Sequence, residues 1–187
     1  MRFLFVLFST LVLTSCQDDV LIKPKAQLSL DYAKANYKDF ESDCDYSFEK
    51  NEWALLKKKK DCGLNLYYPK MKATLYITYQ KVNKTNLTSL LKDAQKLTYD
   101  HAQKAESIPE QPFVNPDKKV YGMFYMLNGN AATQAQFYVT DSVHHFVSGA
   151  LYFEAKPNFD SIYPAVVYLR NDMRHIMESM EWGKKIN

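Results

Sequence analysis

The chain has 187 residues, of which 47% are hydrophobic and 24% are charged, as is typical of one globular domain with a short appendage. The formal net charge of +3 is too small to favour nucleic acid as a partner. Aromatic residues make up 14% of the chain against only 5 glycines, and this balance favours a fold rich in strands.

The first 15 residues are predicted to be an export signal. Arg2 supplies a positive charge, and the apolar run at 3–13 is too short to cross a hydrocarbon core about 30 Å thick. The sequence Leu13-Thr14-Ser15-Cys16 resembles a bacterial lipobox, in which small residues precede an obligatory cysteine. We predict that Cys16 becomes the lipidated first residue of the mature protein and carries palmitate or a similar chain. Two or more acyl chains anchor a protein stably, whereas one does not.

The next stretch is predicted to link this anchor to the folded domain. Residues 16–42 contain Pro24 and several lysines but show no sustained hydrophobic period. We therefore predict a lipidated N-terminus and tether over 16–42, followed by a single globular domain over 43–187.

Strand patterns dominate the first part of the domain. Residues 46–50 and 52–57 are predicted to form a hairpin that turns at Asn51, and alternation over 64–68 and 73–82 predicts two further strands. The lysine run 57–60 is interpreted as a solvated hairpin end, with contact to an acidic partner or lipid headgroups as the alternative.

Two body cysteines flank the predicted hairpin. Cys44 and Cys62 stand 18 positions apart, and an isolated pair in an exported protein is a disulfide candidate. In the chain-entropy model, closing a loop of this size stabilises a fold by about 3 kcal/mol.

A helical period then replaces the alternation. Apolar residues recur on one stripe over 87–106, with Asn86 as the predicted N-cap. The proline-rich segment 107–119 is predicted to be a loop.

The last part of the domain is predicted to contain three strands and a helix. The strands lie at 119–127, 133–140 and 144–155, separated by turns at 128–130 and 141–142. The helix is predicted to begin at Ser161 as its N-cap, which would place Pro164 in the first turn.

This order of elements predicts the fold class. Two amphipathic helices must each cover a sheet, so we predict an α+β fold with a mainly antiparallel sheet and two helices packed on it. The order resembles that of the Mog1/PsbP-like sandwiches.

No arrangement of residues indicates catalysis or metal binding. The four histidines are scattered, and His144 and His145 are neighbours on a predicted strand, so their side chains point to opposite faces. His101 falls on the apolar stripe of its helix, where a histidine of the core boundary is the expected role. Ser142 lacks a nucleophile-elbow context, and the sequence contains no phosphate, dinucleotide, zinc-protease or calcium motif. We predict no enzyme activity, no catalytic residues and no cofactor.

Two short motifs indicate a modification. Asp141-Ser142-Val143 and Asp160-Ser161-Ile162 match the acceptor pattern for O-glycosylation in Bacteroidota. A turn and a helix cap account for the same residues, so Ser142 and Ser161 remain alternatives to be tested.

Several stretches together resemble the GldD family of gliding motility lipoproteins of the Bacteroidota. They are collinear and span nearly the whole mature chain: TSC followed by acidic residues, FESDCDYSFE, YPKMKATLYITY, LLKDAQKLTYDHAQKA, QPFVNPDKKVYGMFY, QFYVTDSVHHFVSGALYF and PNFDSIYPAVVYLRNDMRHIMES. The sequence departs from the family at Gly63, where a bulky and often aromatic residue is expected. Only Cys16 carries over as a functional position.

The resemblance implies a membrane lipoprotein required for gliding and linked to type IX secretion. It would act without catalysis, as an assembly or stabilising factor for other lipoproteins and membrane proteins of that machinery. Gln17-Asp18-Asp19 resembles an acidic surface-export signal, but a periplasm-facing position on the outer membrane is favoured over the inner membrane. The alternative function is a periplasmic carrier or binding domain for a lipid or small apolar ligand.

Overall fold

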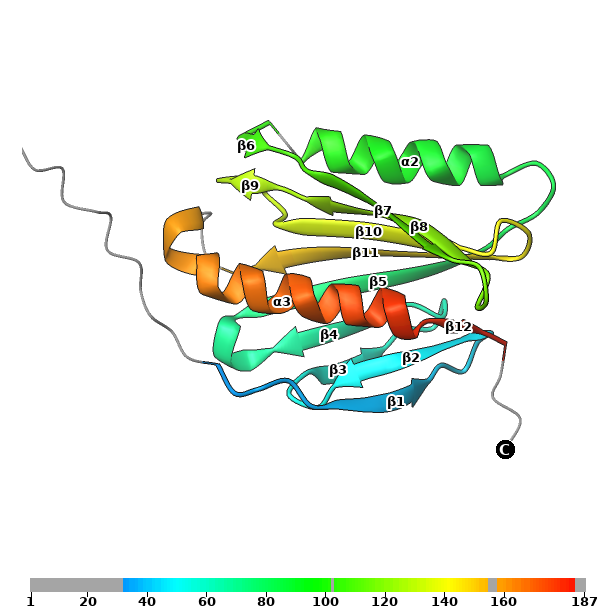
Figure 1. The fold of residues 1–187 in the computed structure, drawn as a ribbon, viewed down its shortest axis with the longest axis horizontal. Helices are drawn as coiled ribbons and strands as arrows, with labels where there is room; N and C mark the ends of the chain where they lie inside the picture. The colour runs from blue at the N-terminus through cyan, green and yellow to red at the C-terminus, as the bar shows by residue number, and fades with distance from the viewer. Residues whose placement is uncertain (1–31, 102, 155–157, 184–187) are drawn as a thin grey trace, which may run out of the picture.

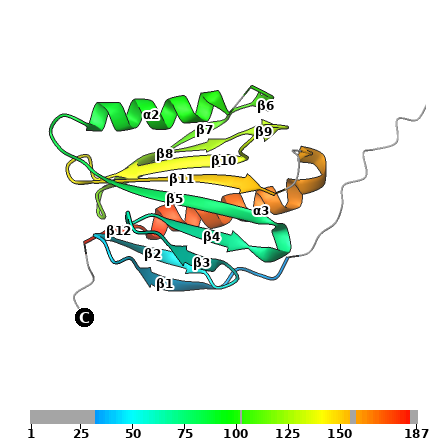
Figure 2. The ribbon, with the colours of Figure 1, turned by 180° about the vertical axis from the view of Figure 1, so that it is seen from behind.

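The computed structural model describes residues 32–101, 103–154 and 158–183, which form three layers (Figure 1). A seven-stranded antiparallel sheet lies in the middle. Helix α2 (Leu87–Asp100) covers part of its outer face, while helix α3 (Phe159–Ser179) and a three-stranded sheet cover the inner face, as the view from behind also shows (Figure 2). The predicted α+β class with a mainly antiparallel sheet is confirmed.

All strand pairs in both sheets are antiparallel. In spatial order, the large sheet consists of β3 (Leu55–Lys58), β4 (Leu64–Tyr68), β5 (Ala73–Lys81), β11 (His145–Phe153), β10 (Ala135–Thr140), β8 (Val120–Met126) and β7 (Glu110–Asn115). The small sheet consists of β1 (Tyr37–Glu41), β2 (Tyr46–Asn51) and β12 (Glu181–Trp182). Short elements complete the fold: the 3-10 helix η1 (Pro69–Met71) and the paired strands β6 (Ala105–Ser107) and β9 (Asn128–Gly129).

The alternation in the sequence decides which face of the large sheet is buried. On β5, Leu75 and Ile77 are buried on the inner face, while Tyr76 and Thr78 lie on the outer face. Gly149 pairs with Ile77 on one side and with Phe137 on the other. A Cβ atom on Gly149 would lie 2.2 Å from the Phe137 ring, so this ring packs directly over the glycine backbone.

Helix α3 packs between the large sheet and β2. Its buried face consists of Ala165, Val166, Leu169, Met173, Ile176 and Met177. Several of these side chains join one hydrophobic cluster that includes Phe48 of the small sheet and Leu75 of the large sheet. The small sheet is therefore held to the large sheet through a shared core.

Two buried charged side chains of α3 reach in different directions. Arg170 is 7% exposed and donates to the backbone oxygens of Leu127 and Gln134 at 3.0 and 2.9 Å. Burial lowers the pKa of Arg170 to about 10, so the guanidinium stays charged at neutral pH. Arg170 thus fixes α3 to the connection between β8 and β10.

Asp172 connects α3 to the small sheet. It is 2% exposed and accepts hydrogen bonds from the Tyr37 hydroxyl at 2.6 Å and from Asn51 Nδ2 at 2.7 Å. Burial raises the pKa of this carboxyl, although both hydrogen bonds act to lower it.

The structure corrects the predicted start of the domain. Strand β1 pairs with β2 along its whole length, so the fold includes residues that the sequence placed in the 16–42 tether. Only Phe40 of this strand is buried, which leaves the alternation too weak to identify. The predicted hairpin at Asn51 is also wrong, because β2 belongs to the small sheet and β3 to the large one.

The first helix and the proline-rich segment also differ from expectation. Helix α2 ends at Asp100 rather than 106, and Asn86 makes no side-chain cap; the Asn83 side chain instead accepts the amides of Thr85 and Asn86. Within the predicted loop 107–119, β7 forms the edge of the large sheet. An edge position tolerates proline because the missing N–H is not needed by a further strand.

The second helix begins three residues earlier than predicted. Its N-cap is Asn158, so Ser161 lies inside α3 and does not cap it, and Pro164 stands at the sixth helical position. The predicted turn at 128–130 partly forms strand β9.

The packing of α3 predicts how a truncation there would affect stability. Replacing Met173 by alanine removes a fully buried side chain between the sheets and should lower the free energy of unfolding by about 2–5 kcal/mol. Denaturant unfolding followed by circular dichroism measures this change. Glu178→Ala, on the exposed face of the same helix, is the control and should change stability by about 0.5 kcal/mol or less. Equal effects would contradict the described packing.

Candidate functional site

Four modification sites were predicted from the sequence: one lipidation site, one disulfide and two glycosylation sites. The structure describes all of them except the lipidation site. Cys16, the predicted lipidation site, lies outside the described residues. The disulfide candidates lie in two loops, with Cys44 between β1 and β2 and Cys62 between β3 and β4. Ser142 lies in the turn between β10 and β11, and Ser161 lies in the first turn of α3.

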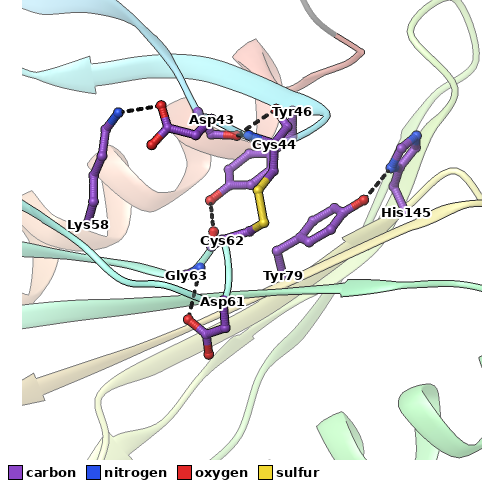
Figure 3. The surroundings of a disulfide bond; sticks show 10 residues. Asp43, Cys44, Tyr46, Lys58, Asp61, Cys62, Gly63, Tyr79 and His145 are labelled. Carbon is purple, nitrogen blue, oxygen red and sulfur yellow. Dashed lines mark hydrogen bonds and ion pairs between the residues drawn. A yellow bond between two sulfur atoms is a disulfide. The ribbon is translucent and has the colours of Figure 1, made fainter.

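A disulfide joins Cys44 and Cys62, with a Cα–Cα distance of 5.9 Å (Figure 3). Because β2 and β3 belong to different sheets, the bond crosslinks the small sheet to the large one rather than closing a hairpin. Tyr46 strengthens the junction by donating from its hydroxyl to the Cys62 carbonyl oxygen at 2.6 Å. Lys58 and Asp43 add an exposed ion pair at 2.8 Å.

Gly63, which directly follows the disulfide cysteine Cys62, packs close to β5. A Cβ atom there would lie 3.0 Å from the Ile77 carbonyl oxygen and 3.2 Å from the Asp61 carboxylate. The Gly63 amide also donates to Asp61 at 3.3 Å. A larger side chain at this position would therefore require the segment after Cys62 or its neighbours to shift by a few tenths of an ångström.

An aromatic chain continues from the disulfide along the same end of the domain. Tyr46 stacks on Tyr79, whose hydroxyl lies 2.9 Å from His145 Nδ1 (Figure 3). The His145 ring in turn stacks on Trp182. Burial lowers the pKa of His145, so this imidazole is neutral at pH 7. Among the described residues, no group of three or more His, Cys, Asp or Glu side chains could hold a metal ion.

The turn between β10 and β11 is organised by one carboxylate. Asp141 Oδ1 accepts hydrogen bonds from the backbone amides of Val143, His144 and His145 at 2.8–3.0 Å. Burial would raise the pKa of Asp141, but these amides lower it below its ordinary value. Ser142 adopts a φ of 67° within this turn and is exposed.

Both glycosylation candidates have exposed side chains, but they differ in backbone context. Ser142 lies in a turn, whereas Ser161 lies in helix α3. O-glycosylation at either residue stays a prediction, and a hexose-type mass shift on the corresponding peptide would establish it.

A groove of about 180 Å³ lies between α2 and the outer face of the large sheet. Its lining includes Tyr76, Tyr138 and Tyr152 from the sheet and Leu97 from the helix. At its polar edge, Thr98 donates to Gln136 at 2.9 Å, and Gln136 Nε2 lies 3.3 Å from His101 Nδ1. The predicted boundary role of His101 fits this position at the end of α2.

A second groove of about 180 Å³ lies where the tether enters the domain. It is lined mainly by apolar and aromatic surface, including Tyr32, Trp53, Met71 and Tyr168. Local sequence patterns do not predict this site, because its residues come from the predicted tether, a loop, β4, η1 and α3. Only the exposed Trp53 could have indicated it.

The fold and the crosslink define a class of protein. They describe a small disulfide-linked α+β domain of the kind found in oxidising compartments outside the cytoplasm. Within the described ranges, no helix combines the length and apolarity needed to cross a bilayer.

A family model described as "Gliding motility lipoprotein GldD" matches residues 17–182. The chain therefore belongs to this family of gliding motility lipoproteins, whose members are lipid-anchored proteins of the cell envelope. No curated protein and no solved structure matches the chain. The likeness to Mog1/PsbP-like sandwiches accordingly stays a prediction.

The position of the disulfide predicts the effect of removing it. Replacing Cys44 and Cys62 together by serine should lower the free energy of unfolding by about 2–4 kcal/mol, because the unfolded chain loses its closed loop. Denaturant titration with and without reductant measures this change. Reductant should destabilise the parent protein but not the double variant. Two reactive thiols in denatured, unreduced Cys16→Ala protein would contradict the bridge.

The hydrogen bonds of Asp141 predict a dependence of stability on pH. Because its pKa is lower in the folded state, Asp141 contributes fully to stability above the unfolded value of about 3.9, and this contribution is lost as pH falls through the folded pKa. Asp141→Asn should remove that part of the acid dependence. Asp141→Ala should cost about 2 kcal/mol at pH 7, since three backbone amides lose a charged acceptor.

Thermal unfolding at a series of pH values tests the Asp141 prediction. The control is Asp117→Asn, which removes an exposed carboxylate from another turn. An unchanged acid dependence in Asp141→Asn would show that the carboxylate charge does not stabilise the turn.

Proposed function

We propose that the protein is anchored by lipid on Cys16 and supports the gliding machinery, including its link to type IX secretion, as a non-catalytic assembly factor. The observation that carries this proposal is the family match, which begins at residue 17, directly after the lipobox cysteine. We place the domain on the periplasmic side of the outer membrane. Its partners would be other gliding and secretion lipoproteins and membrane proteins.

The mechanism follows from confinement. A lipid anchor holds the domain in a thin layer beside the membrane, and the tether sets its effective concentration at a membrane-embedded partner. Contacts that would be weak in free solution can then be occupied most of the time. The proposed role therefore needs a rigid domain with accessible surfaces and no reactive centre.

Two structural features support such a role: a well-connected domain and an exposed sheet face. The small sheet is connected to the rest of the domain by the shared core, the disulfide and Asp172. Arg170 connects α3 to the segment between β8 and β10. The outer face of the large sheet is exposed at Tyr76 and Thr78 of β5, which offer aromatic and hydroxyl groups for protein contact.

The carrier alternative has less support from the described surface. The grooves below α2 and at the tether each hold about 180 Å³. Cavities for small molecules typically hold about 300–1,000 Å³, so either groove would enclose only part of a lipid. Lipid recovered with the purified domain by mass spectrometry would restore this alternative.

The proposed role predicts that the anchor is needed for function but not for folding. A Cys16→Ala protein exported by a different signal should keep its circular dichroism spectrum and melting temperature yet fail to restore gliding in a deletion strain. Colony spreading and single-cell tracking measure the result. Intact-mass measurement of the wild-type protein checks for the lipid on Cys16.

Full restoration of gliding by the unanchored domain would refute the role assigned to the anchor. Ser15→Ala keeps a small residue before the cysteine and is the matched control. It should be lipidated and should restore gliding. Crosslinking in intact membranes, followed by pull-down, identifies the partners.

A further inference from the structure

The groove at the tether entrance lies beside Tyr32, where the described chain begins. The ribbon enters the domain at one end (Figures 1 and 2). Tyr32 is the first described residue, and its ring contacts Tyr168 of α3 with a centroid distance of 5.6 Å. Trp53, in the connection between β2 and β3, and Met71 of η1 line the same groove. We call Tyr32, Trp53, Leu55, Lys70 and Met71 the tether-end surface. The small-sheet strand β12 and the described C-terminus lie at the opposite end of the domain.

The tether-end surface combines exposed apolar side chains with an indole N–H and a lysine ammonium group. Trp53 is 51% exposed and Leu55 is 59% exposed, although both are large hydrophobic residues. The Trp53 indole nitrogen donates to the Lys34 carbonyl oxygen at 3.3 Å, and the Lys70 ammonium lies 5.5 Å from the Trp53 ring centroid. Tryptophan and tyrosine with lysine at their edge are the residues that settle at a membrane–water interface.

Charge at this end also favours an anionic surface. Lys70 and Lys72 flank Met71, and the nearby carboxylate of Glu52 is paired with Lys38. Glu154 is an acidic residue close to the two lysines, and its backbone amide donates to the Lys72 carbonyl oxygen. Each lysine close to an anionic bilayer contributes about 1 kcal/mol to binding.

The length of the tether brings this end of the domain to the bilayer. Residues 17–31 separate Cys16 from Tyr32, and a flexible chain of that length reaches about 20 Å on average and about 55 Å when fully extended. Helix α3 has 21 residues and extends about 30 Å from the tether end toward the far end. The tether-end surface is therefore within average reach of the bilayer, and the far end is not.

We propose that the tether-end surface docks on the lipid bilayer that holds Cys16, with Trp53 and Leu55 inserted at the headgroup level. This proposal rests on the proposed lipidation of Cys16. Docking fixes the orientation of the domain, because the disulfide junction, the Ser142 turn and β12 then point away from the membrane. These far-end surfaces are thereby presented to partners at a set height above the bilayer.

The chain contains 2 tryptophans, Trp53 at the tether end and Trp182 at the far end, and they report the orientation directly. Trp182→Phe leaves Trp53 as the only tryptophan, and Trp53→Phe leaves Trp182. Each lipidated variant is reconstituted in vesicles of phosphatidylethanolamine and phosphatidylglycerol that contain a lipid with a shallow doxyl quencher. We expect Trp53 emission to fall about twofold, as for a side chain at headgroup depth, while Trp182 emission is unchanged.

Matched charge reversals test the contribution of the surface. Lys70→Glu, in the Trp182→Phe background, should remove most of the Trp53 quenching. Lys84→Glu, in the exposed loop between β5 and α2 at the far end, should leave it unchanged. Circular dichroism of both variants checks that the fold is intact. Equal quenching in both charge variants and the parent would overturn the role of Lys70 and of charge.

Vesicle flotation separates the two ways in which the proposal can fail. If the protein floats with the vesicles but Trp53 is not quenched, the proposed docking of the tether-end surface is wrong, while the proposed lipidation of Cys16 is retained. If the protein does not float, lipidation of Cys16 is wrong and the docking proposal falls with it. Equal quenching of Trp53 and Trp182 would overturn the proposed orientation.

Discussion

The fold depends on two buried charges that stand two residues apart on α3. Arg170 binds the carbonyl oxygens of the β8–β10 connection, and Asp172 binds side chains of β1 and β2. Removing either charge from water costs several kcal/mol unless hydrogen bonds replace the lost hydration, as they do here. A buried charge with a full set of partners tolerates little displacement. The helix is therefore fixed in rotation and depth, and the two sheets are fixed relative to each other.

The disulfide makes the same connection at the far end of the small sheet. Asp172 holds the sheet through Asn51, the last residue of β2, while Cys44 holds it just before β2 begins. With both ends of a short strand fixed, the three-stranded sheet cannot separate from the large one without breaking a covalent bond or exposing a charge. The proposed role as an assembly factor would benefit from such rigidity, because an ordered surface loses less entropy when a partner binds.

The two ends of the domain have different chemistry. Aromatic and lysine side chains gather where the tether enters, while the crosslink, the Asp141 turn and the Tyr79–His145–Trp182 chain occupy the far end. Under the docking proposed above, this division would separate the surface near the membrane from the surface that meets partners. The two apolar grooves, below α2 and at the tether, are small, so recognition by exposed surface fits this protein better than enclosure of an apolar ligand.

Much of this protein could be predicted from local pattern, because burial on one face imposes a period of two on strands and of 3.6 on helices. The strands at β5, β8, β10 and β11 and both helices follow from such patterns. The candidate disulfide follows from the isolated cysteine pair, and the lipobox marks Cys16 by the chemistry of its residues. Two strands were not predicted. Strand β1 buries too few residues to show alternation, and β7 contains a proline that is tolerated because the strand lies at the sheet edge. Only the tertiary structure decided that β2 and β3 belong to different sheets. The same is true of the grouping of Tyr32, Trp53 and Met71 on one surface, because those neighbours are chosen by long-range packing and not by the residues beside them in the chain.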